Sequence, residues 1–325
     1  MKTILNILIV ILLVVLLYIL IYPQYQENKP APIRIGTERS LNSLVLFFAE
    51  ENGFLKGQKL LPEYIFADSP DELYSRLLAK EIDLAVLPWS TIFKRVIEKG
   101  ETVKVFISGN FRAGIPISAI FAHPKVKVQT LKDLKGKRFG YPLYFADLVP
   151  VILSENGLSV KDLILSPLPQ GEIPEKLKNG ELDCALVCEP YRTQLIKEGM
   201  ALVFDAVLGK SFLAPFPAFA YAINPSLIRE KRKVGVRLKI ATDMAITLAD
   251  KEPESMRAVL IKRLGLDSER VANFNLPEIE KLAGINKSQI QAYLLNLAER
   301  GVINREAIKD FRVENLLVAP VDMQP

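Results

Sequence analysis

Histidine and cysteine are scarce in this sequence, whose 325 residues include one histidine and two cysteines. The histidine, His123, precedes Pro124 in what the pattern predicts to be a surface turn. Because zinc sites are built mainly from these two residue types, a metal site has no ligand set here. A G-x-S-x-G nucleophile elbow is also absent. Hydrolytic and metal-dependent mechanisms therefore lack their parts, and we expect no metal, no cofactor and no catalytic residues.

The two cysteines, Cys184 and Cys188, lie in one run of apolar residues that is typical of a strand. At a rise of about 3.3 Å per residue, their Cα atoms would be about 13 Å apart. A disulfide needs a Cα–Cα distance below about 7 Å. We therefore predict two buried thiols that do not pair with each other.

Long runs of like charge are absent as well. The formal net charge is +5, and the basic residues are scattered along the chain. This distribution is typical of a solvated basic surface, which tolerates an anionic ligand or an anionic lipid face. It gives no indication of nucleic-acid binding.

A long apolar run, in contrast, opens the chain. After Lys2, residues 3–22 are apolar with little interruption except Asn6. About twenty such residues can cross a bilayer, whereas the apolar region of a cleavable signal has about 7–15 and ends at small residues. No small-x-small site and no lipobox cysteine follows the run. We predict an uncleaved transmembrane signal anchor at residues 1–22 and a linker at 23–32; a cleaved signal or a core helix is the alternative.

The charge before this run predicts the orientation of the protein. Lys2 favours a cytoplasmic amino terminus. We therefore expect a single-pass protein of the cell membrane. Its globular part would lie on the extracytoplasmic side, periplasmic or extracellular.

Two stretches of the chain, 80–90 and 179–191, share one pattern. Each follows a short amphipathic helix and places an aspartate, Asp83 or Asp183, before small and β-branched apolar residues. Such a run predicts a strand buried on both faces, as in a parallel sheet. Each run ends at a proline that polar and aromatic residues follow. Because ligands bind outside the carboxyl ends of strands in open α/β sheets, the repeat predicts two similar lobes facing one cleft.

Strands and helices alternate up to residue 223. The expected strands lie at 33–36, 61–66, 82–87, 103–108, 117–122, 138–141, 163–166, within 179–191, at 201–205 and at 218–223. Capping boxes predict helix starts at Ser69, Thr130 and Ser159. From Pro225 on the pattern predicts helices only, the longest over 226–250 and another over 277–300.

Segments marked by glycine and proline at 109–116 and 213–217 predict two crossovers between the lobes. Lobe 1 is then discontinuous and consists of residues 33–113 and 217–325. Lobe 2 spans residues 114–216. In this arrangement the C-terminal helices return to the first lobe.

Three segments resemble one family of proteins. Residues 131–140 read Leu-Lys-Asp-Leu-Lys-Gly-Lys-Arg-Phe-Gly, the stretch 180–191 ends in Glu-Pro-Tyr, and the tail at 297–315 is similar to the family's closing helices. Over about residues 33–317 the chain resembles the substrate-binding proteins of ABC importers for sulfonates, taurine, nitrate and pyrimidine thiamine precursors. Cys188 and Glu189 stand where the sulfonate group has tryptophan and aspartate.

The resemblance implies an α/β protein with the two-lobed type II periplasmic-binding-protein fold. Two parallel-rich sheets flanked by helices would be joined by a hinge of two crossovers, after the predicted transmembrane helix. It further implies a monomeric solute-binding protein, not an enzyme, that closes on a small anionic or heteroaromatic ligand. The protein would deliver this ligand to the permease and ATPase subunits of an ABC importer.

Other functions stay open. One is a sensor domain or a binding module without a transporter. Another is an enzyme on the same fold, of the menaquinone- or thiamine-pathway type, although such enzymes would normally be cytoplasmic. A last one is a DNA-binding helix-turn-helix at 278–290, with Gly284 at the turn. That segment is not strongly basic, and a helix pair packed on the first lobe is favoured.

Two loops of the first lobe supply candidate ligand contacts, namely Arg39, Ser40 and Leu41 after the first strand and Trp89, Ser90 and Thr91 after the third. Both loops lead into a helix, where free N–H groups and a partial positive charge suit an oxyanion. Ser40 and Ser90 are the best candidates, and the alternative is that each only caps its helix. Trp89 either stacks on a planar ligand or packs beneath its loop.

The remaining candidates are Arg112 in the first crossover, Tyr141, Tyr144, Glu189 and Arg192 after strands of the second lobe, and Phe216 in the return crossover. Arg39 and Arg112 offer an oxyanion a bidentate fork, or are surface arginines. The resemblance implies ligand contacts from the loop of Tyr141 and Tyr144. Glu189 either accepts an ammonium or ring N–H, or is a helix-start carboxylate that pairs with Arg192.

Overall fold

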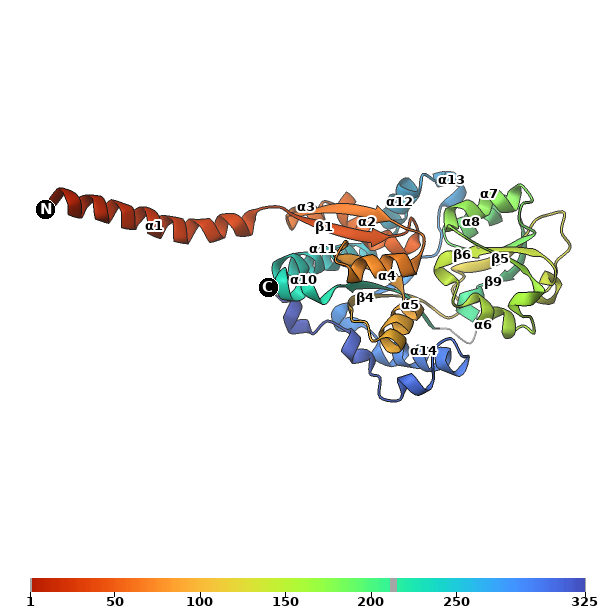
Figure 1. The fold of residues 1–325 in the computed structure, drawn as a ribbon. Coiled ribbons are helices and arrows are strands. Elements are labelled where there is room, and N and C mark those ends of the chain that lie inside the picture. Colours follow the sequence, from red (N-terminus) through yellow and green to blue (C-terminus); the bar gives the residue numbers. More distant parts are fainter. Residues whose placement is uncertain (1, 211–214, 325) are drawn as a thin grey trace.

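The computed structural model describes residues 2–210 and 215–324. They form a long N-terminal helix and two lobes that lie side by side, each around its own sheet (Figure 1). Residues 213 and 214 of the predicted return crossover lie outside the described residues, as do Met1 of the predicted anchor and residues 211–214 of the predicted second lobe.

The first sheet has six strands in the order β11-β4-β10-β3-β1-β2. β1 runs parallel to β2 and β3, whereas β10 runs antiparallel to β3 and β4, and β11 antiparallel to β4. The strands are β1 Ala31–Thr37, β2 Leu60–Phe66, β3 Leu84–Pro88, β4 Lys104–Phe111, β10 Phe216–Ile223 and β11 Glu278–Lys281.

The second sheet repeats this plan with the order β7-β6-β8-β5-β9. β6 runs parallel to β7 and β8, and β5 runs antiparallel to β8 and β9. The strands are β5 Ser118–Ala122, β6 Arg138–Pro142, β7 Ile164–Leu168, β8 Cys184–Cys188 and β9 Ala201–Asp205. In each sheet the three parallel strands point the same way, so the loops at their carboxyl ends gather at one edge.

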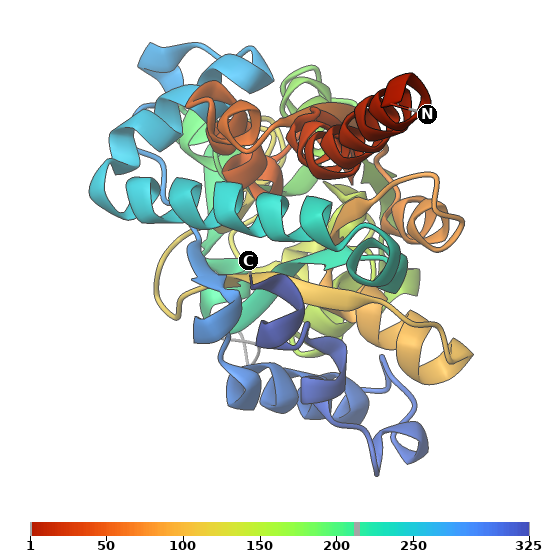
Figure 2. The ribbon, with the colours of Figure 1, turned by 90° about the vertical axis from the view of Figure 1, so that its left-hand side faces the viewer.

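Helices cover both sheets. They are α1 Lys2–Asn28, α2 Leu44–Glu51, α3 Phe54–Gly57, α4 Pro70–Leu78, α5 Trp89–Phe93, α6 Val149–Ser154, α7 Ile173–Lys178, α8 Tyr191–Lys197, α9 Val207–Lys210, α10 Pro225–Glu230, α11 Arg232–Lys251, α12 Pro253–Leu264, α13 Ser268–Val271 and α14 Lys287–Glu299. α11 and α12 pack on α2, and α11 runs across the first lobe in Figure 2. α13 contacts α8 of the second lobe, so the C-terminal part of the chain contacts both lobes.

The C-terminal part differs from the prediction of helices only. Residues 278–281 form strand β11, and helix α14 begins at Lys287, so the helix predicted over 277–300 is wrong in its first part. The cause is tertiary, because the free edge of β4 offers β11 backbone partners that the local pattern does not reveal. A segment that begins as a strand is also no helix-turn-helix. The helix predicted over 226–250 is interrupted at Lys231, where α10 gives way to α11.

Helix α1 extends beyond the predicted anchor, because residues 23–28 of the expected linker are helical. Figure 1 shows it projecting away from both lobes. Among the described residues, no helix combines the length and the apolar character that crossing a membrane requires, so the transmembrane helix predicted at residues 1–22 is not supported.

Several local predictions are confirmed. Thr130 and Ser159 each form a capping box with the aspartate three residues on, although the helices they start are short 3₁₀ turns. The Oγ of Ser69 accepts from the N–H of Glu72, with Pro70 in the first helical turn. Cys184 and Cys188 are both buried and free in β8.

The two aspartates of the repeated pattern tie the beginnings of the parallel strands together. Asp83 accepts from the N–H of Arg34 at 3.0 Å, from its Nε and Nη2 at 3.1 Å, and from Nζ of Lys231 at 3.1 Å. Asp183 accepts from the N–H of Arg138 at 2.8 Å and from its Nε and Nη2 at 3.2 and 2.7 Å. We call these two contacts the strand clamps. The first clamp joins β1 to the loop before β3, and the second joins β6 to the loop before β8.

The strand clamps also set the ionisation of both aspartates. Burial alone would raise the pKa of Asp83, but the hydrogen bonds from Arg34 and Lys231 outweigh it and lower the pKa below its usual value. The hydrogen bond from Arg138 lowers the pKa of Asp183. Both carboxylates are therefore ionised near neutral pH, as a clamp on an arginine requires.

We expect Asp83→Asn to destabilise the protein more than Asp183→Asn, because the Asp83 side chain is 9% exposed and that of Asp183 19%. Losing hydrogen bonds between charged groups should lower the free energy of unfolding by about 1–3 kcal/mol for Asp83→Asn. Urea unfolding at pH 7 measures both variants. Because the folded pKa of Asp83 is lowered, its contribution is present above the unfolded pKa of about 4 and is lost as pH falls. Equal losses, or a difference between wild type and Asp83→Asn that persists undiminished at pH 3, would contradict the assignment.

Candidate functional site

A cavity of about 290 Å³ lies between the two lobes, where loops at the carboxyl ends of parallel strands meet. We call it the cleft cavity. Its lining comes from the loops after β1, β2, β7 and β8 and from the end of α12, and consists of Glu38, Arg39, Asp68, Pro169, Gln170, Gly171, Glu172, Tyr191, Arg263 and Leu264. This is the position that the strand-end rule predicts for a ligand in an α/β sheet.

Glu38 is the most unusual group of the cleft cavity. Its side chain is buried, and its Oε1 accepts from Nδ2 of Asn42 at 2.9 Å. Burial raises the pKa of Glu38 to about 7, against the opposing effect of hydrogen bonds from Ser40 and Asn42. The charge of Glu38 in turn raises the pKa of Tyr144, Cys188 and Tyr191 in the second lobe, after the larger effect of burial on each. The carboxyl of the first lobe therefore acts across the boundary between the lobes.

Glu38 was not among the site residues predicted from the sequence. The three residues that follow it were, because helix starts and arginines suggest an oxyanion site. The available signal was the position itself, since Glu38 comes directly after the last residue of β1. An acidic side chain at that position enters the cleft as readily as its neighbours do.

The predicted residues beside Glu38 have different surroundings. Ser40 caps the 3₁₀ helix at Leu41–Ser43, since its Oγ accepts from the N–H of Asn42 at 3.2 Å, and both Ser40 and Leu41 are buried. Arg39 lines the cleft cavity, and its guanidinium lies 4.1 Å from the centre of the Phe66 ring.

Trp89, Ser90 and Thr91 begin α5 and are all buried. Nε1 of Trp89 donates to Oγ of Ser108 at 3.1 Å, and the indole lies 5.5 Å from the ring of Phe93. The contacts of Trp89 are those of a side chain that packs beneath its loop. None of the three residues lines the cleft cavity.

Arg112 lies elsewhere. It forms a bidentate ion pair with Glu278 of β11, at 2.9 and 2.8 Å, and its side chain is 63% exposed. It lines a separate groove of about 590 Å³ between the first crossover, α11, α12 and β11. The sequence could not reveal this, because the partner lies on a strand that the pattern predicted as helix.

Tyr141 lies within β6 and Tyr144 directly after it, and both are buried. The hydroxyl of Tyr144 has no hydrogen-bond partner among the described residues. Its ring lies 5.4 Å from that of Phe145, which lies 6.3 Å from both Phe111 and Phe216 of the first sheet. Phe216 is thus part of an apolar contact between the lobes.

Glu189 is a fully buried carboxylate whose partners are all internal. Its Oε1 accepts from Nη1 of Arg192 at 3.1 Å and from Oγ1 of Thr193 at 3.0 Å, and its Oε2 from the N–H of Thr193 at 3.0 Å. Arg192 also donates twice to Asp205, at 2.8 Å each. These contacts are those of a helix-start carboxylate, the alternative given above for Glu189.

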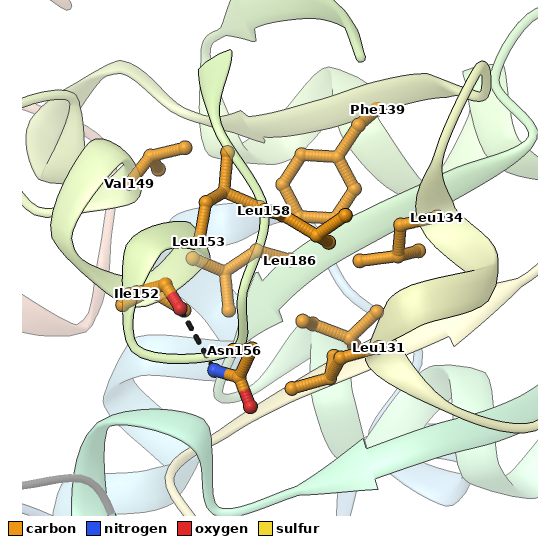
Figure 3. Close-up of a pocket in the computed structure, with 10 residues that line it drawn as sticks. Leu131, Leu134, Phe139, Val149, Ile152, Leu153, Asn156, Leu158 and Leu186 are labelled. Carbon is orange, nitrogen blue, oxygen red and sulfur yellow. Dashed lines mark hydrogen bonds between the residues drawn. The ribbon is translucent and has the colours of Figure 1, made fainter. Parts of the chain in front are cut away.

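A second internal space, inside the lobe of β5 to β9, is too small and too apolar for a solute. It has about 10 Å³ and is lined by leucine, isoleucine, valine and phenylalanine side chains, with Asn156 as its polar residue (Figure 3). Nδ2 of Asn156 donates to the backbone oxygen of Ile152 at 2.8 Å. A space of about one water molecule with a single polar group holds no ligand.

Comparisons with known proteins agree with this architecture. The model of the NMT1-like family matches residues 26–264. The structure superposes on the periplasmic aliphatic sulphonate binding protein SsuA from Escherichia coli with a TM-score of 0.64 and 17% identity, covering 89% of this chain and 99% of that one. It superposes on the periplasmic nitrate-binding protein NrtA from Synechocystis PCC 6803 with a TM-score of 0.64 and 15% identity, covering 90% and 93%. These likenesses confirm the predicted two-lobed α/β fold of periplasmic binding proteins.

One known protein is also similar to this chain in sequence. The chain is 29% identical over 143 residues to a putative thiamine biosynthesis protein from Haemophilus influenzae. The aligned part covers 43% of this chain and 44% of that protein, less than half of either.

The raised pKa of Glu38 makes a prediction about stability. Its folded pKa of about 7 exceeds the unfolded value of about 4.3, so stability falls as pH rises between these values and stays lower above them. Glu38→Gln removes this ionisation. We expect the variant to exceed wild type in free energy of unfolding by about 3 kcal/mol at pH 8 and by little at pH 4.5.

Urea unfolding of the ligand-free protein at both pH values measures this difference. Glu63→Gln, at an exposed position of β2, is the control and should show no comparable change with pH. A difference between Glu38→Gln and wild type that is the same at pH 8 and pH 4.5 would show that folding does not raise the pKa of Glu38.

Proposed function

The chain belongs to the NMT1-like family, and from this premise we propose that it is a solute-binding protein that captures a small ligand in the cleft cavity. The observation that carries the proposal is the position of the cavity at the carboxyl ends of parallel strands from both sheets. A ligand there contacts both lobes at once, so its binding favours their closure by a hinge motion. We further propose the lobe boundaries of the sequence prediction, 33–113 with 217–325 and 114–216, except that residues 31, 32 and 216 belong to strands of the first sheet.

The lining of the cavity supports binding of a polar solute. A volume of about 290 Å³ is close to the lower end of the range for small-molecule sites, about 300–1,000 Å³. Charged groups from both lobes surround the space, with Glu38 buried, Arg263 half-buried and Arg39, Asp68 and Glu172 exposed, which gives a ligand polar partners rather than an apolar wall. We propose Glu38, Arg39 and Tyr191 as contacts, with Ser40 and Tyr144 close behind them.

The class of ligand and its destination are proposals drawn from relatives. The superposed proteins bind an aliphatic sulphonate and nitrate, and the sequence relative is named for thiamine biosynthesis. By analogy this chain takes a small anionic or heteroaromatic solute and passes it, as a monomer, to an ABC importer. The permease and ATPase subunits of that importer would dock on the closed form.

The name of the Haemophilus relative also supports one rival function, an enzyme of thiamine synthesis on the same fold. A buried carboxyl with a pKa of about 7 has the acidity of a general acid–base group. The two functions differ in what happens to the ligand. A binding protein returns the ligand unchanged after denaturation, whereas an enzyme converts it over time.

The binding proposal is tested by thermal unfolding with a panel of alkanesulfonates, taurine, nitrate, bicarbonate, aminopyrimidines and aromatic carboxylates. A ligand at about 100 times its dissociation constant adds about 2.7 kcal/mol of stability, which raises the midpoint by a few degrees. We expect Gly171→Phe to abolish this shift, because Gly171 lines the cavity and an added side chain there meets the Tyr191 hydroxyl.

Gly57→Phe is the matched control, since Gly57 has open space around it and lies outside the cavity. It should keep the full shift. A ligand whose shift survives in Gly171→Phe binds elsewhere, and a panel without any shift, together with no ligand recovered from native protein, would refute solute binding. Mass spectrometry of the released ligand separates binding from conversion.

We also propose that α1 holds the protein in the cell membrane, with the lobes on the extracytoplasmic side. No described helix has the length and hydropathy of a membrane span, so the proposal rests on the surface of α1. The helix has 27 residues, about 40 Å at 1.5 Å per residue. Residues 9–20 are all large and apolar and are 46–60% exposed. A continuous apolar surface of this kind is stable against lipid rather than water.

We expect the full chain to stay in the membrane pellet after an alkaline wash. Leu13→Arg combined with Leu16→Arg should release most of it, because each arginine at the centre of a spanning helix costs about 2.5–3.5 kcal/mol or more. Leu202→Arg with Phe204→Arg is the control, placed at exposed apolar positions of β9. Recovery of the wild type in the soluble fraction would refute the anchor.

A further inference from the structure

We propose that the ligand of the cleft cavity carries a protonated nitrogen base, such as an amine or an amidine, which pairs with the carboxylate of Glu38. This inference rests on the proposed function and names the ligand class that the site selects. It distinguishes this chain from the superposed proteins, whose names give anionic ligands.

The charges of the cavity are the first support. Three carboxylates line it, Glu38, Asp68 and Glu172, and none of them forms an ion pair within the described residues. Two guanidinium groups line it as well, Arg39 and Arg263. Arg263 already pairs with Glu50 at 2.5 Å and with Glu51 at 3.3 Å on the outer side. The cavity therefore holds an excess of negative charge that a cationic ligand would neutralise.

The burial of Glu38 is the second support. Burying an ionised carboxylate without a cationic partner is unfavourable, because the charge loses its hydration. This loss raises the pKa of Glu38 to about 7. Burial also raises the pKa of Asp68, with smaller effects from Glu172 and Glu72. A cationic ligand would reverse the effect on Glu38, because an opposite charge within a few ångströms favours the ionised form. An anionic ligand would have to enter beside the carboxylates and would raise their pKa values further.

The hydrogen bonds of Glu38 are an independent observation. Its Oε1 accepts from Nδ2 of Asn42 at 2.9 Å, and no cationic side chain of the described residues forms an ion pair with it. The two oxygens of a carboxylate accept several hydrogen bonds, so Glu38 has capacity left for a ligand N–H group. Glu189 offers no such opening, since its two oxygens accept from Arg192 and Thr193. A ligand that pairs with Glu38 and contacts Tyr191, which lines the cavity from the second lobe, links the two lobes.

The groups that face Glu38 determine how binding depends on pH. On its own lobe these are Asp68, Arg39 and the hydrogen-bond donors Ser40 and Asn42, and on the other lobe they are Tyr144, Cys188, Tyr191 and Glu172. Burial raises the pKa of Cys188, Tyr191 and Tyr144, so they are neutral at pH 6–8. Glu38 is then the group that titrates in this range. With a pKa of about 7, its ionised fraction falls about tenfold from pH 8 to pH 6.

The test uses benzamidine, a planar cation, with benzamide and benzoate as neutral and anionic probes of the same size. Calorimetric titration of the full chain in detergent at pH 8 should show benzamidine binding at least tenfold more tightly than either. Its affinity should fall about tenfold at pH 6. Glu38→Gln should remove both the preference and the pH dependence. Glu63→Gln, at an exposed position of β2 outside the cavity, should keep both.

Tighter binding of benzoate than of benzamidine, or a cation preference that survives in Glu38→Gln, would overturn the inference. If none of the three probes binds, the ligand released from protein purified from its own cells decides. A released molecule with a basic nitrogen supports the inference, and an anion without one overturns it while the proposed function stands. If no molecule is released and no panel compound shifts the unfolding midpoint, the proposed function fails as well.

Discussion

The architecture depends on two aspartates, each of which holds an arginine at the start of its sheet. Asp83 ties the loop before β3 to Arg34 of β1, and Asp183 ties the loop before β8 to Arg138 of β6. Because each aspartate accepts both a backbone N–H and the guanidinium, the contact fixes where the parallel strands begin relative to each other. The carboxyl ends then emerge together on the opposite edge of each sheet. The cavity between the lobes is a consequence of this alignment.

The carboxylates of the strand clamps and the carboxylate of the cleft cavity differ in the partners that surround them. The clamps and Glu189 surround each carboxylate with donors, so the charge is compensated by the protein itself. Glu38 has an amide donor and no cation, although it is buried as deeply. A fold under selection for stability alone would replace such a group with an apolar one, since well-packed apolar residues are at least as stable. The contrast within one chain is the reason for assigning Glu38 to ligand binding.

Local signals predicted the order of elements well and their partners poorly. Ten of the eleven strands in the described residues lie where the patterns placed them, within a few residues, because alternation, capping residues and prolines act over short distances. β11 was missed because its four residues, Glu278 to Lys281, gain their strand conformation from the edge of β4. The same contact explains Arg112, whose partner Glu278 lies on that strand. Neither fact is visible to a pattern that considers one segment at a time.

The sequence alone determined the repeated α/β plan, the two free thiols and the side of the sheets on which a ligand would bind. These follow from the periodicity of apolar residues and from the geometry of a single strand, which need no knowledge of distant segments. The tertiary structure alone decided which strand-end residues share a cavity. It brought Glu38 and Arg39 of the first lobe to Tyr191 of the second, and left Trp89 and Arg112 outside. Charge balance in a cavity depends on the sum of all neighbours, and that sum exists only once both lobes have folded against each other.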